Sequence, residues 1–193
     1  MLYNELKNRH LILASGSPRR QQFLKDLGLN YEIRLKEIEE HYPENLKKAE
    51  ITDFLAKLKA GPFTGDLKDN EILITSDTIV WLDNKAIGKP GSSSEAKKML
   101  RELSDNMHEV ITSVALTDNV HQVVINDITK VYFKKLSDTE IDYYLKNYRP
   151  FDKAGSYGIQ EWIGFIGIEK IEGSYFNVMG FPTHKFYQAL LEF

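Results

Sequence analysis

The first part of the chain alternates a short apolar run with a helical pattern. Leu11 to Ala14 form an apolar run, which predicts a buried strand. After a tight turn, Ser17 is suited to cap a helix, Pro18 to occupy its first position and Gly28 to follow its end. The pattern therefore predicts a strand, a loop and the start of a helix.

A second helix is expected over residues 51–59, where apolar residues recur at helical spacing. An apolar run over 72–75 then leads into Ser76-Asp77-Thr78 and a further strand, and Asp83-Asn84 is suited to a hairpin turn. Asp77 is thus expected inside a strand or at a break between two strands.

The second half of the chain continues the alternation of helices and strands. It predicts a helix capped by Ser92 and Glu95, strands over 109–117 and 121–133, a helix from a Ser137–Glu140 capping box to Tyr148, a strand over 163–171, and a helix over 183–191. Helices interleaved with hairpins predict an α/β fold with a mixed β-sheet and flanking helices. We expect one domain over residues 1–193, with room for two lobes.

Composition narrows the classes of function. With 193 residues and 42% hydrophobic residues the chain can bury a core, and its net charge of −3 gives no general attraction to long nucleic acid. The absence of cysteine excludes disulfides, thiolate zinc sites and a cysteine nucleophile. The N-terminal sequence resembles neither a signal peptide nor a membrane span, so we expect a cytoplasmic protein without membrane attachment.

The segment from Ser15 to Arg20 is a candidate anion site. It places two hydroxyl groups and two guanidinium groups where the first helix begins, and the N–H groups of a helix start favour an anion. Arg19 and Arg20 would oppose the helix dipole by up to about 1 kcal/mol each, whereas a bound polyphosphate would reverse that effect. The alternative is a solvated surface turn.

Three acidic residues are candidates for proton transfer or metal binding. Asp77 follows an apolar strand, a position from which a carboxylate can hold a metal ion or deprotonate a water. Glu39 and Glu40 could share a hard cation with Asp77, because Mg²⁺ takes oxygen ligands and usually arrives with phosphates. A structural Asp and a solvated acidic loop are the alternatives.

Lys59, Lys89 and Gln160 complete the candidate residues. The lysines are possible counter-charges for an anion, and Lys89 lies between Gly88 and Pro90, which restrict its backbone. Gln160 ends a glycine-punctuated segment that begins at Asp152, and its amide could read the polar edge of a base. A surface lysine and a turn with an exposed Gln are the structural alternatives.

Two other chemistries find no support in the sequence. The five histidines are scattered without a short pair or an HExxH pattern, so a histidine-based zinc site is not expected. No serine lies in a GxSxG or SxxK pattern, which argues against a serine hydrolase.

Taken together, the segments resemble the Maf family of nucleotide pyrophosphatases over nearly the whole chain. The matching segments are Leu13 to Arg20, Ile38-Glu39-Glu40 with Leu58-Lys59-Ala60, Ser76-Asp77-Thr78 with Gly88-Lys89-Pro90, Asp152 to Gln160, and Gly173 to Pro182. The resemblance implies an α/β fold related to the inosine-triphosphate pyrophosphatase (Ham1) fold, with two lobes around a cleft. It also implies hydrolysis of a nucleoside triphosphate to the monophosphate and pyrophosphate, by water attack on the α-phosphate.

The resemblance also implies roles for individual residues. Asp77 is the expected proton acceptor, and Glu40 helps it to bind Mg²⁺ or Mn²⁺. The phosphates are expected to lie among Ser17, Arg19, Arg20, Lys59 and Lys89, where fixed positive charge would stabilise the transition state. A homodimer is expected only by analogy.

The Gly-Ile-Gln ending of the fourth segment resembles the branch that hydrolyses dTTP and UTP, in which Arg19, Thr78 and Gln160 would set specificity. Two departures affect this expectation: Ser76 replaces a usual Ala, and Glu161-Trp162 follows Gln160 where a Gly-rich stretch is common. Two alternatives stay open, a housecleaning pyrophosphatase for damaged or non-standard purine triphosphates and a nucleotide-binding regulator of septum formation with little turnover.

Overall fold

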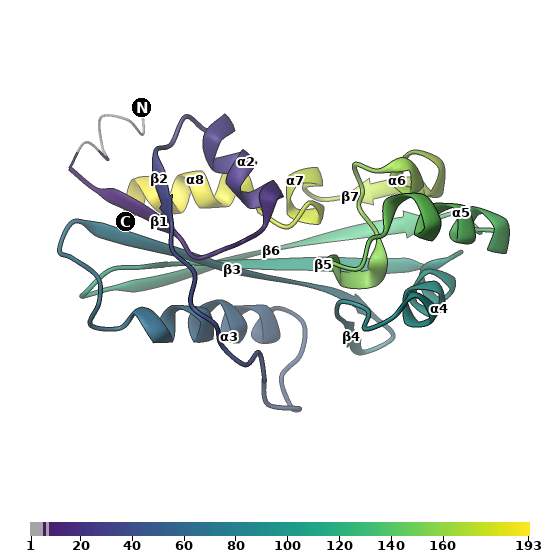
Figure 1. The fold of residues 1–193 in the computed structure, drawn as a ribbon, viewed down its shortest axis with the longest axis horizontal. Helices are drawn as coiled ribbons and strands as arrows, with labels where there is room; N and C mark the ends of the chain where they lie inside the picture. The colour runs from purple at the N-terminus through teal and green to yellow at the C-terminus, as the bar shows by residue number, and fades with distance from the viewer. Residues whose placement is uncertain (1–5, 7) are drawn as a thin grey trace. The chain divides into compact units, whose positions relative to one another are not determined.

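The computed structural model describes residue 6 and residues 8–193, and its chain divides into two compact units (Figure 1). The first unit comprises the chain up to Asp77, Thr112–Asp127 and Gly180–Phe193, and the second comprises Thr78–Ile111 and Ile128–Met179. Three long strands contribute to both units: β3 (Glu71–Leu82), β5 (Met107–Thr117) and β6 (Gln122–Phe133).

The strands form a seven-stranded mixed sheet. Their order is β2-β1-β3-β5-β6-β7, and β4 pairs with β3 away from this path. In the first unit β1 (His10–Leu13) runs parallel to both β2 (Tyr31–Ile33) and the first residues of β3. Because parallel strands need a crossover, α2 (Pro18–Asp26) connects β1 to β2, and α3 (Ala49–Ala60) lies between β2 and β3 in the chain.

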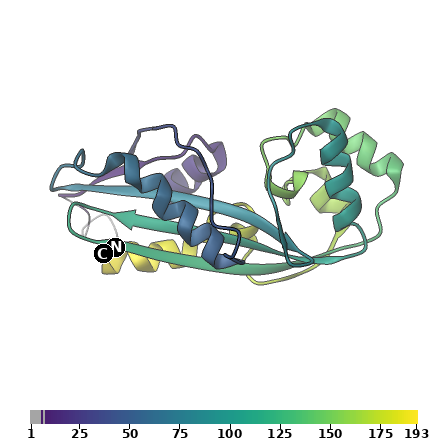
Figure 2. The same cartoon turned by 90° about the horizontal axis from the view of Figure 1, so that it is seen from below.

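Helices cover both faces of the first unit's sheet. α3 lies on one face, and α2 and α8 (Thr183–Glu192) lie on the other (Figures 1 and 2). On the α2 side, Phe181 stacks on Phe23 at 6.2 Å between ring centroids and contacts Phe186 at 4.8 Å. β1 and the parts of β3 and β5 in this unit are therefore buried on both sides, which explains their continuous apolar runs in the sequence.

The second unit is built around a hairpin and three helices. β3 turns into β4 (Lys85–Ile87) through Asp83 and Asn84, whose φ angles of 48° and 60° match the type I′ geometry that suits a tight hairpin. β6 pairs antiparallel with β7 (Ile168–Glu172). The helices of this unit include α4 (Ser93–Leu103), α5 (Asp138–Tyr148) and α6 (Trp162–Gly167).

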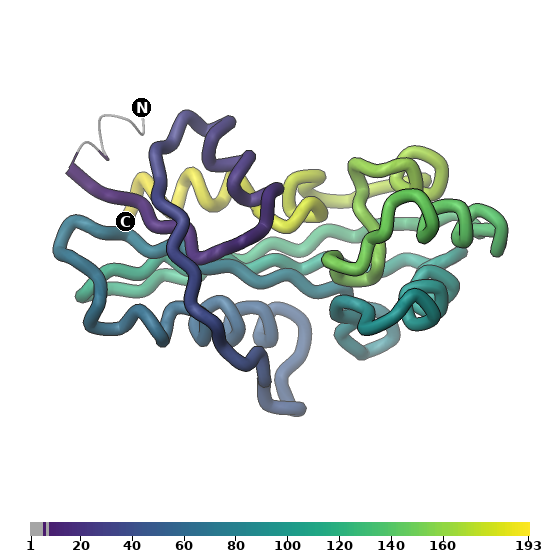
Figure 3. The backbone as a smooth tube through the Cα atoms, in the orientation of Figure 1, coloured from purple at the N-terminus to yellow at the C-terminus, as the bar shows by residue number. Residues whose placement is uncertain are grey.

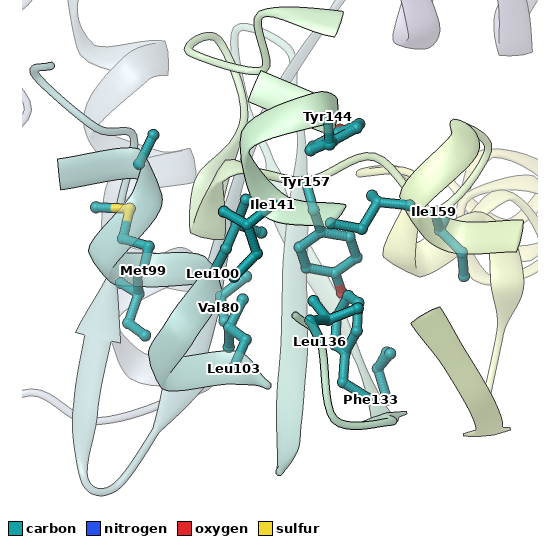
Figure 4. Packing of buried hydrophobic residues seen from close by; sticks show 14 of the residues in the cluster. Val80, Met99, Leu100, Leu103, Phe133, Leu136, Ile141, Tyr144, Tyr157 and Ile159 are labelled. Carbon is teal, nitrogen blue, oxygen red and sulfur yellow. The ribbon is translucent and has the colours of Figure 1, made fainter. Parts of the chain in front are cut away.

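A hydrophobic cluster fills the second unit (Figure 4). Leu100 and Leu103 of α4 and Ile141 of α5 pack against residues of β3, β5 and β6. Tyr157 inserts from the segment that precedes α6 and meets Phe133 edge-on at 5.1 Å. The segment over 152–160 therefore contributes buried side chains to this core.

Most expected elements are confirmed, but the strand expected over 163–171 is wrong. Residues 162–167 form α6, and only 168–172 form a strand. A short apolar run fits a buried strand and a buried helix equally well. Within α6, position 164 requires glycine, because an added Cβ would lie 1.9 Å from the Ile159 carbonyl oxygen.

Two helices end in partly exposed apolar residues, although their helical periodicity predicts that Tyr148 and Leu191 face inward. Tyr148 at the end of α5 is 39% exposed, and Leu191 near the end of α8 is 37% exposed. The Ser92 side chain caps α4 as expected, but Glu95 returns to the Gly91 N–H and not to that of Ser92. The remaining short elements are η1 (Gly61–Phe63), η2 (Ala154–Ser156) and α7 (Tyr175–Val178).

No helix in the described part of the chain combines the length and the apolar character needed to cross a bilayer.

The capping box of α5 provides a test of the fold. Ser137 Oγ accepts the Glu140 N–H at 3.2 Å, and Glu140 Oε2 accepts the Ser137 N–H at 2.7 Å. We expect Ser137→Ala to lower the free energy of unfolding by about 1 kcal/mol, because the Glu140 N–H at the helix start loses its acceptor while the Ser137 N–H keeps the Glu140 carboxylate. Urea unfolding measures this, with Thr139→Ala in the same turn as the control; equal values for the two variants would contradict the prediction.

Candidate active site

Asp77 lies inside β3, a strand that is buried along almost its whole length. Side chains alternate along a strand, so Thr75 and Asp77 point to the same face. That face carries α3: Thr75 Oγ1 donates to the Ala56 carbonyl at 2.7 Å, and Lys59 Nζ donates to Asp77 Oδ1 at 2.6 Å. Asp77 is 7% exposed, and Lys59 supplies the cation that a carboxylate at such a position requires.

Lys59 also pairs with Glu40. Its Nζ lies 3.1 Å from Glu40 Oε1, so one ammonium group joins two carboxylates. Glu40 belongs to the long segment over 34–48 that leads from β2 to α3, and the backbone tube in Figure 3 follows this path. The segment thus brings a distant acidic residue to the carboxylate of β3.

Arg20 approaches the same strand from the opposite face. Its Nη1 donates to the Ser76 carbonyl at 2.9 Å and to Ser15 Oγ at 3.4 Å, and its Nε donates to the Gly180 carbonyl at 3.0 Å. Arg20 therefore joins the start of α2, the strand beside Asp77 and the segment before α8. These bonds to main-chain carbonyls give Arg20 a structural task that the sequence did not predict.

The start of α2 keeps the features of an anion site. Ser17 is the N-cap residue, and in the described chain its side chain does not cap the helix; its N–H donates to Ser15 Oγ at 3.3 Å. Pro18 occupies the first turn, and no acidic residue does. Arg19 and Arg20, both partly buried, follow directly. The N–H groups of this turn and two guanidinium groups therefore belong to one short segment.

The charges around Arg20 partly offset one another. Burial lowers the pKa of Arg20 to about 10, the nearby Asp77 and Glu40 carboxylates raise it, and Arg19 lowers it. Arg20 is therefore still protonated at neutral pH. Two carboxylates thus lie among three cationic side chains in this unit.

The donor set fits a hard cation. Carboxylate oxygens of Asp77 and Glu40 both contact the Lys59 ammonium group, which stands in for a metal cation. Oxygen ligands suit Mg²⁺ or Mn²⁺. Residues 6 and 8–193 contain no group of three or more acidic, His or Cys residues able to hold a metal.

The remaining candidates belong to the second unit. Lys89 is exposed in the Gly88-Lys89-Pro90 loop, and Thr78 and Gln160 are partly buried. The Gly155 N–H donates to the Gly88 carbonyl at 3.0 Å, so the segment ending at Gln160 is bonded to the loop that carries Lys89.

Position 155 accepts only glycine. Its φ is +68°, and an added Cβ would lie 2.9 Å from Val80 Cγ2. Both the backbone conformation and the space against β3 require glycine.

The structure thus brings Glu40, Lys59 and Asp77 into direct contact, with Arg20 bonded to the residue before Asp77. Lys89, Thr78 and Gln160 lie in the other unit. Ser15, whose hydroxyl the sequence placed in the candidate anion segment, accepts from both Ser17 N–H and Arg20. Sequence reasoning assigned no role to Lys153, which is 9% exposed. A lysine inside a glycine-punctuated apolar segment was the available signal for Lys153.

The chain matches the model of one protein family, described as "Maf-like protein", over residues 10–193. It is 60% identical over 190 residues to a protein of Flavobacterium johnsoniae named dTTP/UTP pyrophosphatase, covering 98% of both chains. It is 61% identical to a protein of the same name from Flavobacterium psychrophilum, covering 99% of this chain and 98% of the relative.

A solved structure supports the fold assignment. The Staphylococcus aureus Ham1 protein is 14% identical and matches with a TM-score of 0.53, over 95% of this chain and 98% of that one. At this level of identity the likeness concerns the fold alone.

Ser76 provides a test of the site's packing. Its Oγ is buried and finds no hydrogen-bond partner among the described residues. An unsatisfied buried hydroxyl is costly, so we expect Ser76→Ala to raise the free energy of unfolding by about 1 kcal/mol in urea titrations.

Thr75→Val is the matched comparison on the neighbouring residue. Its hydroxyl is bonded to the Ala56 carbonyl, so this variant is expected to lose stability by about 1 kcal/mol. A loss of stability in Ser76→Ala would show that the Ser76 hydroxyl has a partner, and would contradict the prediction.

Proposed function

This chain belongs to the Maf family, and we propose that it is a nucleoside triphosphate pyrophosphatase that converts dTTP and UTP to the monophosphate and pyrophosphate. The observation that carries this proposal is the cluster of Asp77, Lys59 and Glu40 in a chain whose full-length relatives bear the name dTTP/UTP pyrophosphatase. The enzyme is a hydrolase acting on a phosphoric anhydride.

Asp77 is the proposed general base. It accepts a proton from a water whose oxygen attacks the α-phosphorus; the bond from the α-phosphorus to the bridging oxygen breaks, and pyrophosphate leaves with the electron pair. Lys59 orients the Asp77 carboxylate, because its Nζ lies 2.6 Å from Oδ1. A carboxylate held by a strand and an ammonium loses little freedom in the reaction, which favours proton transfer.

The phosphate chain is proposed to bind Ser17, Arg19, Arg20, Lys59 and Lys89. The N–H groups at the start of α2 add donors for phosphate oxygens. Arg20 contributes positive charge while its Nε and Nη1 hold the main chain at Gly180 and Ser76. Charge fixed in this way stabilises the developing negative charge without rearrangement.

Asp77 and Glu40 are the proposed ligands of Mg²⁺ or Mn²⁺. Such an ion, when bound, neutralises phosphate charge and polarises the P–O bonds. Lys59 must then share the two carboxylates with the ion or turn toward the phosphates, and both arrangements keep a cation beside Asp77.

Base selection is proposed to depend on Arg19, Thr78 and Gln160. The Gln160 amide can donate and accept, which matches the adjacent carbonyl and N–H groups of uracil and thymine. A site that hydrogen-bonds a base rejects bases that leave its polar groups unpaired.

In the cell we propose that the enzyme works in the cytoplasm, as the lack of cysteine suits, and removes surplus or modified pyrimidine triphosphates before they enter nucleic acids. A homodimer is the proposed assembly.

Asp77→Asn tests the general base. The amide cannot accept the proton, so kcat should fall at least about a thousandfold, while dTTP binding measured by calorimetry stays within a few-fold. Asp83→Asn, at the exposed hairpin turn of the same strand, is the control and should keep full activity. A fully active Asp77→Asn enzyme would refute the assignment of the base.

The substrate assignment is tested by pyrophosphate release with Mg²⁺ or Mn²⁺ across dTTP, UTP, CTP, dATP, GTP, 7-methyl-GTP and ITP. Fast release is expected from dTTP and UTP only, because cytosine and adenine lack an adjacent carbonyl and N–H for Gln160, and guanine and hypoxanthine carry such a pair on a larger ring system. Preferred turnover of purines would indicate a housecleaning enzyme, and binding without turnover would indicate a nucleotide-binding regulator.

A further inference from the structure

A buried polar network lies behind Gln160 in the second unit. Glu161 Oε1 pairs with Lys153 Nζ at 3.0 Å, and Glu161 Oε2 accepts a short hydrogen bond from the Tyr144 hydroxyl. The side chains of Lys153 and Glu161 are only 10% and 19% exposed. A charged pair at this depth needs a reason, because solvent would stabilise both charges better than a partly buried site does.

The network ends on the main chain of the segment that carries Gln160. The Tyr144 hydroxyl donates to Glu161 and accepts the Gly158 N–H at 3.0 Å. Since the hydroxyl has one proton, the bond to Glu161 fixes its direction and turns a lone pair toward Gly158. Burial, and secondly the bond to Glu161, raise the pKa of Tyr144, so the hydroxyl keeps this proton.

Glycine at position 158 makes room for this arrangement. An added Cβ would lie 2.8 Å from Glu161 Cδ and 3.0 Å from Glu161 Oε2. The φ of Gly158 is not in the left-handed region, so the requirement is for space and not for backbone freedom. The Glu161 carboxylate therefore rests directly on the backbone two residues before Gln160.

The backbone on both sides of Gln160 is fixed by neighbouring contacts. Glu161 N–H donates to the Gly158 carbonyl at 3.0 Å, and α6 packs against the Ile159 carbonyl through Gly164. Tyr157 enters the core, where its hydroxyl lies 2.7 Å from His108 Nε2 (Figure 4 shows its ring). Gln160 is thus a partly buried residue at the end of a segment that these hydrogen bonds and packing contacts hold in place.

We propose that Glu161 is a positioning residue for base selection: through Lys153 and the Tyr144 hydroxyl it holds the backbone of Gly158 to Gln160, and so sets where the Gln160 amide meets the base. This inference rests on the proposed role of Gln160. It gives a purpose to Glu161, which departs from the Gly-rich pattern that the family resemblance led us to expect.

Glu161→Gln is the first variant to test. A neutral amide cannot satisfy both the Lys153 ammonium and the donating Tyr144 hydroxyl as the carboxylate does. We expect the ratio of kcat/KM for dTTP over dCTP to fall about tenfold, since selectivity depends on matched polar groups. Asp142→Asn is the control. It neutralises an exposed carboxylate of α5, the helix that carries Tyr144, and this carboxylate pairs with Lys97 of α4. This variant should leave the ratio within about twofold.

Tyr144→Phe is the second variant, because it keeps the ring and the Lys153–Glu161 pair while removing only the link to Gly158. The same loss of selectivity is expected, together with faster hydrogen exchange in a peptide covering 156–160. An unchanged ratio in both variants, or an equal fall in kcat/KM for all nucleotides, would overturn the proposal.

Failure of the proposed base-reading role of Gln160 and failure of the positioning role of Glu161 give different results. If Gln160→Ala leaves the ratio unchanged, the proposed base-reading role fails, and Glu161 loses its effect on selectivity with it. Hydrogen exchange over 156–160 is independent of the substrate: unchanged exchange in Glu161→Gln and Tyr144→Phe overturns the positioning role itself, whichever nucleotide the enzyme prefers.

Discussion

A carboxylate inside a strand that is covered on both faces has to be matched by positive charge, and the pairing of Asp77 with Lys59 satisfies this constraint. The pairing fixes the register between α3 and β3, since Lys59 reaches Asp77 only if Thr75 also meets the Ala56 carbonyl one turn earlier. It also holds the middle of the segment over 34–48, because Glu40 shares the same ammonium group. The carboxylate proposed as the general base is thus held by the same contacts that pack α3 on the sheet.

The opposite face of the strand is held by main-chain bonds. Arg20 binds the Ser76 and Gly180 carbonyls, so a residue that the family pattern associates with phosphates also carries the backbone beside Asp77. An arginine can do both, because its planar group has five N–H donors. Asp77 is consequently held from α3 through its side chain and from α2 through its neighbour.

Sequence signals were sufficient where the determinants are local. The Ser137–Glu140 capping box, the Asp83-Asn84 turn and the Ser17-Pro18 helix start all lie within a few residues of the elements they define. Prediction failed where the local pattern is ambiguous or short: the apolar run after Glu161 fits a buried strand as well as the helix it forms, and β2 has only three residues. The same contrast between local signals and the folded structure applies to the site. Asp77, Lys59 and Glu40 were candidates from their positions in the sequence, and the family resemblance assigned them to one site, whereas the pairing of Lys153 with Glu161 depends on a fold that no short spacing encodes.

The hydrogen bond from Gly155 to the Gly88 carbonyl has a consequence for fidelity. It joins the backbone of the segment that ends at Gln160 to that of the loop carrying Lys89, and neither peptide can move far without the other. With the proposed roles of Gln160 and Lys89, a base that fits poorly would strain the first segment and, through this bond, the loop of the lysine proposed to hold the phosphates. A mismatched nucleotide would then lose both binding time and reaction rate.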